Sequence, residues 1–461
     1  MCRSLNHATI TLLVLLIASS AYPTEIRLPE FRTVQLPNGM VLHVGENHSV
    51  PAVTVSVVLP CGYEYDPPGK RGLARTTAEA CYGGGIPGME DGPQGGLMRL
   101  GSQITRWTDY DGTVFSMTSI SSNWKAALDI LAKIIRVPIL SKREITRQRD
   151  ASISATSRNL EQPASLARLN LLDLLYEGPL SEPPTVAAAK SISRDDVVGF
   201  HSRHYLPNRA ILVAIGDFNA NEAIEVLRGA FDDWPKGNEP PEAPQSRLRI
   251  DGPRVLLVDK PDLTQATIWC GHAGLQSSDP DRFAFAIANT ALGGHFNSRL
   301  QTRLRSEGGL TYHAGSFHSG QLRHGQFIVS TYTRNEELGC AIHEIGSVLA
   351  DFTRSGMTPD EFGTARNYLL GNYLIYHETP QQVTEGLIWA LAMGHSIEDY
   401  AAEPAHFEAV TLEEANRAMA SHITPDRMVW VIVADKDKIG SALDALGDYE
   451  TVYYKDSLNP R

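Results

Sequence analysis

Apolar side chains recur every three or four residues in two well-separated stretches of the chain. One stripe holds Trp124, Ala127, Leu128, Leu131, Ile134 and Ile135, and the other holds Leu338, Ala341, Ile342, Ile345, Val348 and Leu349. This spacing predicts a helix with one buried face over each stretch, and Pro138 ends the first of them. Runs rich in β-branched residues over 53–59 and 327–333 predict strands that precede these helices.

Four short segments of the first half return in the second half in the same order. Residues 41–44 match 255–258, 112–116 match 325–329, 140–144 match 357–361, and 204–209 match 422–427, at separations of 213 to 218 residues. This recurrence predicts a duplicated domain. Because the strands and helices follow no regular β-α-β rhythm, we expect an α+β fold. It consists of two tandem homologous domains, each a mainly antiparallel sheet packed against helices.

The ends of these domains are predicted from local composition. Residues 1–21 combine Arg3, an apolar run and small residues ending at Ala21, which is typical of a cleavable signal peptide. An uncleaved anchor is the alternative. We expect domains at 22–235 and 248–461, joined by a proline-rich, polar linker at 236–247. No later stretch is long and apolar enough to span a membrane, so the mature chain is expected to be exported, into the periplasm if the source is a Gram-negative bacterium.

The net charge argues against some classes of binding partner, and the cysteine content leaves the disulfide state open. The 461 residues carry a formal charge of −12, which argues against binding to nucleic acid or anionic membranes. Cys2 lies in the predicted signal peptide, and Cys61, Cys81, Cys270 and Cys340 contain no C-x-x-C pair. Buried free thiols and one or two disulfides both remain open.

The segment 72–85, GLARTTAEACYGGG, follows the strand predicted at 53–59 and has the pattern of a helix start. In one class of zinc peptidases this place carries H-x-x-E-H, which supplies two zinc ligands and a general base one helical turn apart. Those residues are absent here. Two other features have plainer interpretations: His201-x-x-His204 lacks a further ligand at suitable spacing, and the glycine-rich 83–96 is expected to be a surface loop.

Several motifs together give the chain a family resemblance. They are Leu36-Pro-Asn-Gly-Met-Val-Leu, the Gly72-Leu-Ala frame, Tyr205-Leu-Pro-Asn-Arg, Phe296-Asn-Ser-Arg-Leu and Leu304-Arg-Ser-Glu-Gly-Gly-Leu-Thr-Tyr312. With them the chain resembles the pitrilysin/insulinase family of zinc peptidases, in its short-chain, processing-peptidase-like branch. The resemblance covers nearly all of the mature chain and implies one half of a clam-shell chamber.

The resemblance also locates where the family's metal site would be. Arg75 stands at the first His position, Ala78 at the catalytic Glu, Glu79 at the second His, and Ala155 at approximately the third ligand. Zinc catalysis needs about three protein ligands, a polarised water and a base, and none of the four roles is filled. We therefore expect no metal or other cofactor on this chain.

One further element of the family is present in the second half. The resemblance implies that Arg305 and Tyr312 hold the substrate carbonyl and its developing oxyanion at a zinc site supplied by another chain. The expected function is thus the non-zinc subunit of a heterodimeric, exported metalloendopeptidase, inactive alone, that acts on unfolded peptides beside a homologous zinc-bearing subunit. The alternative is a non-catalytic peptide-binding or scaffold protein, as a homodimer of the same fold.

Overall fold

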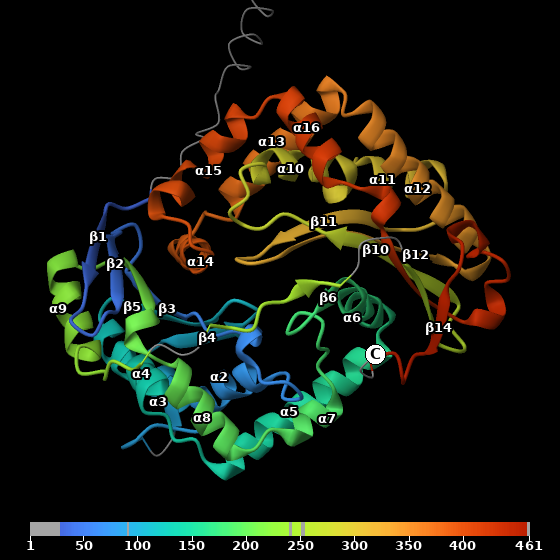
Figure 1. Ribbon diagram of the computed structural model, residues 1–461. Helices are drawn as coiled ribbons and strands as arrows, with labels where there is room; N and C mark the ends of the chain where they lie inside the picture. Colours follow the sequence, from blue (N-terminus) through green and yellow to red (C-terminus); the bar gives the residue numbers. More distant parts are fainter. Residues whose placement is uncertain (1–27, 90–91, 239–241, 250–253, 459–461) are drawn as a thin grey trace, which may run out of the picture.

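The structure is a computed structural model that describes residues 28–89, 92–238, 242–249 and 254–458 (Figure 1). The predicted signal peptide at 1–21 lies outside these residues. Within the described ranges, no helix combines the length and hydropathy that a membrane crossing requires. The four cysteines that the structure describes are all free, and only Cys340 is exposed.

Each half of the chain builds a six-stranded sheet. In the first half the strand order is β1-β2-β7-β3-β5-β4. These strands are β1 (Phe31–Gln35), β2 (Val41–Glu46), β3 (Ala52–Leu59), β4 (Gln103–Thr108), β5 (Thr113–Ile120) and β7 (Ile211–Gly216). In the second half the order is β11-β12-β10-β13-β9-β14. Its strands are β9 (Arg254–Asp259), β10 (Gln265–Ala273), β11 (Ala314–Gly320), β12 (Gly325–Arg334), β13 (Val429–Ala434) and β14 (Glu450–Tyr453).

Helices fill the connections between these strands. The helices of the first half are η1 (Tyr63–Tyr65), α2 (Leu73–Gly83), α3 (Gly92–Arg99), α4 (Trp124–Arg136), α5 (Lys142–Glu161), α6 (Pro163–Leu175), α7 (Val186–Ser191), α8 (Arg194–His204), η2 (Pro207–Arg209) and α9 (Ala220–Phe231). Those of the second half are α10 (Arg282–Asn289), η3 (Thr290–Gly294), α11 (Arg299–Gln301), η4 (Thr302–Glu307), η5 (Asn335–Glu337), α12 (Leu338–Ser355), α13 (Pro359–Ile375), α14 (Pro380–Ala392), α15 (Ile397–Ala409), α16 (Leu412–His422) and η6 (Pro425–Arg427), with the short turns η7 (Lys436–Lys438) and η8 (Asp444–Leu446) near the end.

The two sheets confirm the predicted α+β duplication. Five strands of the two sheets correspond in order and direction. The first sheet has the order β2-β7-β3-β5-β4, and the equivalent order in the second sheet is β9-β13-β10-β12-β11. In both halves the pairing is antiparallel except near one edge, where β2 lies parallel to β7 and β9 lies parallel to β13. The sixth strand differs. In the first half it is β1, which precedes β2 and pairs with it antiparallel, whereas in the second half it is the late strand β14, parallel to β9.

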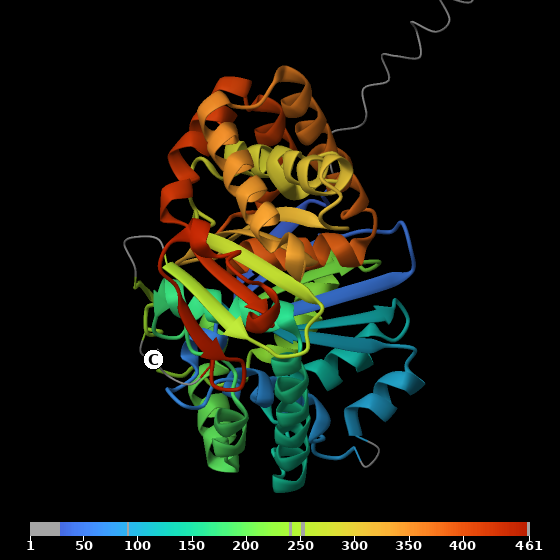
Figure 2. The same cartoon turned by 90° about the vertical axis from the view of Figure 1, so that its right-hand side faces the viewer.

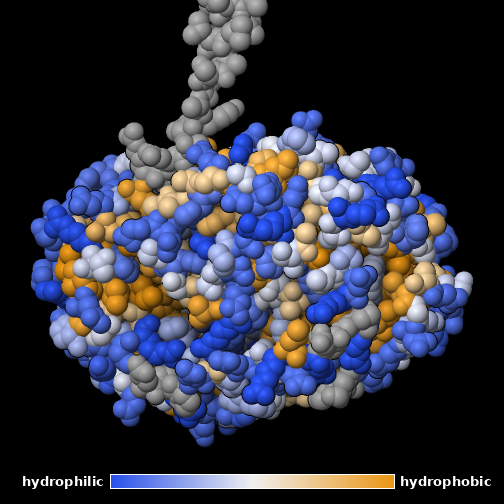
Figure 3. Space-filling model, turned by 45° about the horizontal axis from the view of Figure 1, so that its top comes forward, coloured by the Kyte–Doolittle hydropathy of each residue, from blue (hydrophilic) through white to orange (hydrophobic). Residues whose placement is uncertain are grey.

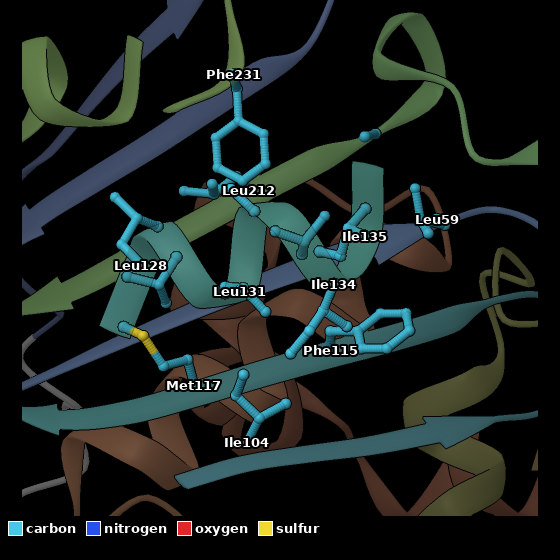
Figure 4. Close-up of a cluster of buried hydrophobic side chains, with 14 of the residues drawn as sticks. Leu59, Ile104, Phe115, Met117, Leu128, Leu131, Ile134, Ile135, Leu212 and Phe231 are labelled. Atoms are coloured by element: carbon cyan, nitrogen blue, oxygen red, sulfur yellow. The ribbon is translucent and has the colours of Figure 1, made fainter. Parts of the chain in front are cut away.

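Helices cover the outer face of each sheet. In the first half, α4 lays its predicted stripe, including Leu128, Leu131 and Ile135, across the buried side chains of β5 and β7 (Figure 4). Phe231 at the end of α9 closes the same core. The helix α12 has the equivalent place in the second half, where Leu338, Ile345 and Phe352 are buried. The alternation of side chains along each strand then leaves a second apolar face on the inner side of both sheets.

Each half covers the inner face of the other half's sheet with one helix. α14, from the second half, packs on β3, β5 and β7, while α6, from the first half, packs on β9, β12 and β13. Figure 1 shows α14 and α6 between the two sheets, with the remaining helices above and below, and Figure 2 shows the same stacking from the side. The molecule therefore has a helix–sheet–helix–sheet–helix order, and the two halves share apolar cores.

The connection between the halves also pairs with the first half. The short strand β8 (Arg247–Leu248), which begins at the last residue of the predicted linker, forms an antiparallel pair with β6 (Tyr176–Glu177). The Tyr176 hydroxyl donates to the Gly325 carbonyl across the interface, at 2.6 Å. Figure 3 shows that hydrophilic side chains cover most of the face turned toward the viewer, with apolar ones gathered toward its two sides.

Candidate functional site

The segment at 72–85 forms the predicted helix, α2. Gly72 precedes it at φ 98°, a left-handed conformation that side chains disfavour. The first turn is capped by Asp66, whose carboxylate accepts from the backbone N–H groups of Gly72 and Ala74, both at 2.7 Å. Burial raises the pKa of Asp66 to about 6, although Arg71 and these two hydrogen bonds oppose the rise. The backbone frame of α2 is thus well formed.

The four positions of the missing zinc motif lie on two helices that pack together. Arg75, Ala78 and Glu79 lie on α2, and Ala155 lies on α5. Ala78 is buried, Arg75 is exposed, and Glu79 and Ala155 are half-buried. Arg75 interacts with the hydroxyl of Tyr63. Glu79 is the one metal-ligating side chain among the four.

Glu79 already has a cationic partner on the neighbouring strand. Arg106 of β4 donates from Nε to the Glu79 carboxylate at 3.0 Å and from Nη2 to the same oxygen, and its guanidinium lies 4.1 Å from the centre of the Tyr82 ring. Glu144 of α5 accepts from Arg147 at 2.6 and 2.8 Å. Both carboxylates, Glu79 and Glu144, therefore have a guanidinium partner.

These residues do not fit a zinc ion. A zinc site needs about three ligands converging on one point, and the four motif positions supply one carboxylate, which Arg106 occupies. In the described part of the chain, the one group of three possible ligands is elsewhere, at Asp279, Asp281 and His422. There Asp281 accepts from His422 at 3.0 Å and pairs with Arg417 at 3.3 Å, so hydrogen bonding accounts for the cluster.

Arg305 and Tyr312 lie at the two ends of a turn held rigidly by its backbone. Arg305 lies in η4, Gly309 turns the chain at φ 60°, and Tyr312 stands just before β11. The Leu310 N–H donates to Leu304 at 2.9 Å. The tightly packed backbone contrasts with the Tyr312 side chain, which is 76% exposed.

The two side chains line one shallow pocket of about 300 Å³, whose other walls come from β10 and β12 and include Tyr332. The Arg305 guanidinium lies 4.9 Å from the centre of the exposed Phe296 ring. Among the residues described, no carboxylate forms an ion pair with Arg305. No hydrogen bond between described residues joins this pocket to α2. Sequence reasoning gave no role to Phe296 or Tyr332, although Phe296 opens a motif that carries the resemblance.

The remaining sequence predictions have mixed outcomes. His201 and His204 were expected to be structural or surface residues, and the structure supports a structural role: the His201 ring contacts the Ile135 carbonyl at 2.8 Å, and burial lowers the pKa of His204 to about 4. The loop predicted over 83–96 was too long, because α3 begins at Gly92 and buries Leu97. Burial of an apolar residue outweighed the low helix propensity of glycine there.

The chain matches two sequence models that describe one peptidase family. Residues 42–183 match the insulinase, or peptidase M16, family, and residues 191–369 match the peptidase M16 inactive domain. An uncharacterized zinc protease of Streptomyces coelicolor is 23% identical over 353 residues, which cover 75% of this chain and 76% of that one. A probable mitochondrial-processing peptidase subunit beta of Arabidopsis thaliana is 24% identical over 276 residues, 58% of this chain and 51% of that one.

Solved structures agree on the fold. A peptidase M16 inactive domain from Pseudomonas fluorescens superposes with a TM-score of 0.81 at 21% identity, covering 88% of this chain and 97% of the other. A protease from Helicobacter pylori also gives 0.81, at 18% identity, covering 88% and 100%. The two sequence models together span most of the described chain, and the fold extends the match over both halves. The chain therefore belongs to the insulinase (M16) peptidase family, with an M16 inactive domain over residues 191–369.

Proposed function

We propose that this protein is the non-zinc subunit of a heterodimeric, exported metalloendopeptidase. Its Arg305 and Tyr312 would complete the active site of a homologous subunit that carries H-x-x-E-H and the zinc ion. The substrate class is an unfolded peptide, held in extended form along a sheet edge. The observation that carries the proposal is the contrast between the halves: the motif positions supply one carboxylate in place of a full set of metal ligands, while Arg305 and Tyr312 line one pocket.

The chemistry of the pair suits this role. When water attacks a peptide carbonyl, negative charge develops on the carbonyl oxygen, and fixed donors aimed at that oxygen lower the barrier. The Arg305 guanidinium stays charged and offers several N–H donors, and the Tyr312 hydroxyl offers one O–H donor. With its rigid turn and exposed ring, Tyr312 can approach a second chain with little loss of backbone entropy.

Metal analysis and reconstitution test the proposal. The purified chain should contain no stoichiometric zinc and cleave no unfolded peptide. Pull-down of the tagged chain from its own host should recover a zinc-bearing homologue, and the recovered complex should cleave peptides. Recovery of a stable homodimer that binds peptides, with no zinc-bearing partner, would instead favour the scaffold alternative and overturn the heterodimer.

Point variants test the two residues within the active complex. Arg305→Ala should lower kcat by roughly 10² to 10³, the usual cost of removing one oxyanion donor, and Tyr312→Phe should lower it in the same direction. The controls are Arg354→Ala and Tyr376→Phe, which change exposed residues of the same types elsewhere in the second half. Unchanged kcat in both site variants would rule out the catalytic role of the pair.

A further inference from the structure

A second cavity lies in the second half, apart from the Arg305 pocket. Its volume is about 410 Å³, within the range of roughly 300–1,000 Å³ that small-molecule sites occupy. Residues from α10, α13, α14, α15 and β11 line it, and it shares no lining residue with the Arg305 pocket. The proposed peptidase role makes no use of this cavity.

Five large aromatic rings line the cavity. They belong to Phe283, Tyr373, Trp389, Tyr400 and Phe407. Phe283 and Phe407 meet edge to face, with ring centres 5.0 Å apart, which fixes one wall. The polar tip of Tyr373 is already satisfied, because its hydroxyl donates to the Tyr400 carbonyl at 3.1 Å. These walls present apolar surface to whatever enters.

Two side chains of opposite charge, Arg282 and Glu403, line the cavity and form no ion pair with any described residue. Arg282 stacks on Phe283, its guanidinium 4.3 Å from the ring centre, and Glu403 lies on α15. In the described residues neither group has an ion-pair partner within 4.0 Å, so they are also farther than this from each other. Of the three histidines that line the cavity, His377 contacts the Tyr373 carbonyl at 2.6 Å and His318 contacts the Leu275 carbonyl at 3.0 Å; the third is His395.

The surroundings of Glu403 disfavour its ionised form. Burial raises the pKa of Glu403 to about 7, and the nearby Arg282 offsets this only in part. A buried carboxylate is stabilised by a cation that also donates hydrogen bonds to it. The guanidinium of Arg282 similarly favours a bidentate carboxylate. A ligand with an ammonium and a carboxylate would satisfy both groups.

We propose that this cavity binds a small zwitterion with an aromatic or large apolar body, such as a free aromatic amino acid or a dipeptide. Its ammonium would pair with Glu403, its carboxylate with Arg282, and its side chain would pack between the rings of Phe283 and Trp389. Rings also attract cations, which adds to the hold on the ammonium. The inference does not rest on the peptidase role, because it concerns this cavity alone.

Isothermal titration calorimetry of the full chain tests the ligand class. The probes are L-phenylalanine and glycyl-L-phenylalanine, with phenethylamine and 3-phenylpropanoate as compounds that carry one charge each. We expect saturable one-to-one binding of at least one zwitterion, and binding at least about tenfold weaker for both single-charge compounds. No heat from either zwitterion up to about 10 mM would overturn the proposal, as would equal affinity for a single-charge compound.

Variants locate the site. Glu403→Gln keeps the shape of the side chain and should weaken zwitterion binding at least about tenfold, and Arg282→Gln should do the same. Glu408→Gln, which changes an exposed carboxylate on the same helix, should bind like the wild type. Thermal unfolding of each variant shows whether it is folded. Wild-type affinity in a folded Glu403→Gln protein would contradict the assignment.

Discussion

The helix α14 makes the stability of the first half depend on the second. Leu387 and Ile388 of this helix are both 0% exposed, and they pack against Val58, Val114 and Ile215 on the inner face of the first sheet. Substituting Leu387 by alanine removes apolar contacts from that sheet and leaves a cavity. The structure thus predicts that a substitution at residue 387, in the second half, lowers the stability of the first sheet, whose last strand in sequence, β7, ends at residue 216.

The magnitude follows from burial. Leucine-to-alanine changes at fully buried sites cost roughly 3–5 kcal/mol, and we expect about 3 kcal/mol here because α14 can shift slightly on the sheet. For a chain of this length the entropy of unfolding, at about 2 cal/mol/K per residue, converts this to a fall in Tm of only about 3 °C. Denaturant unfolding is therefore the more sensitive measurement of the loss.

Amide hydrogen exchange shows where the loss appears. In Leu387→Ala, backbone amides of β3 and β7 should exchange faster, because the strands lose the helix that covers them. The matched control is Glu385→Ala on the same helix, where the carboxylate is half-exposed and only accepts from Gln381 at 2.9 Å. The reasoning is refuted if faster exchange stays within the second half, or if both variants lose equal stability.

Three further predictions concern single side chains. Burial and the nearby Asp111 carboxylate raise the pKa of Glu64 from the usual 4.5 to about 7. The folded chain therefore binds a proton at Glu64 more tightly than the unfolded chain does. The free energy of unfolding falls as the pH rises from about 4.5 to about 7. Glu64→Gln should therefore raise the free energy of unfolding by up to about 3 kcal/mol near pH 8 and by little near pH 4.5. Denaturant titrations at both pH values measure this difference, and an equal gain at both would contradict the prediction. In the chain that lacks residues 1–21, a thiol reagent should modify only Cys340 in the native state and all four cysteines after unfolding. Cys340→Ser should abolish the reaction of the native protein. Arg106→Ala should cost roughly 1–2 kcal/mol in urea unfolding by leaving Glu79 unpaired, and adding Glu79→Gln should recover part of it; no recovery would show that the ion pair is not the cause.

Much of the fold could be predicted because it depends on local periodicity. The helical stripe at 124–135 and the β-branched run at 53–59 became α4 and β3 within one or two residues. The matched segments predicted the duplication, since a repeated order of elements produces a repeated strand order. The same sequence could not predict which sheet α6 covers, because Leu166–Leu175 is apolar on nearly every side and fits any buried position.

The candidate sites were predictable only in part, for a related reason. Arg305 and Tyr312 are close in sequence and share one turn, so their motif was sufficient to pair them; their catalytic role in trans stays a prediction, and the pocket that they line was not predicted. Glu79 and Arg106 come from different elements, and the sequence around either residue does not indicate that β4 brings Arg106 next to Glu79 of α2. The cavity with Arg282 and Glu403 gathers residues from five elements, and its chemistry exists only once the helices pack.

The exchange of α6 and α14 has a consequence for how the chain can be made. A protein synthesised or threaded across a membrane from its N-terminus completes the strands of its first sheet by residue 216, long before residues 380–392 emerge. Until then the inner face of that sheet, with Val58 and Ile215, has no cover. The nascent first half would therefore expose an apolar surface on its first sheet. Although the sequence repeats in two halves, the first half completes its packing only after the second half has been synthesised.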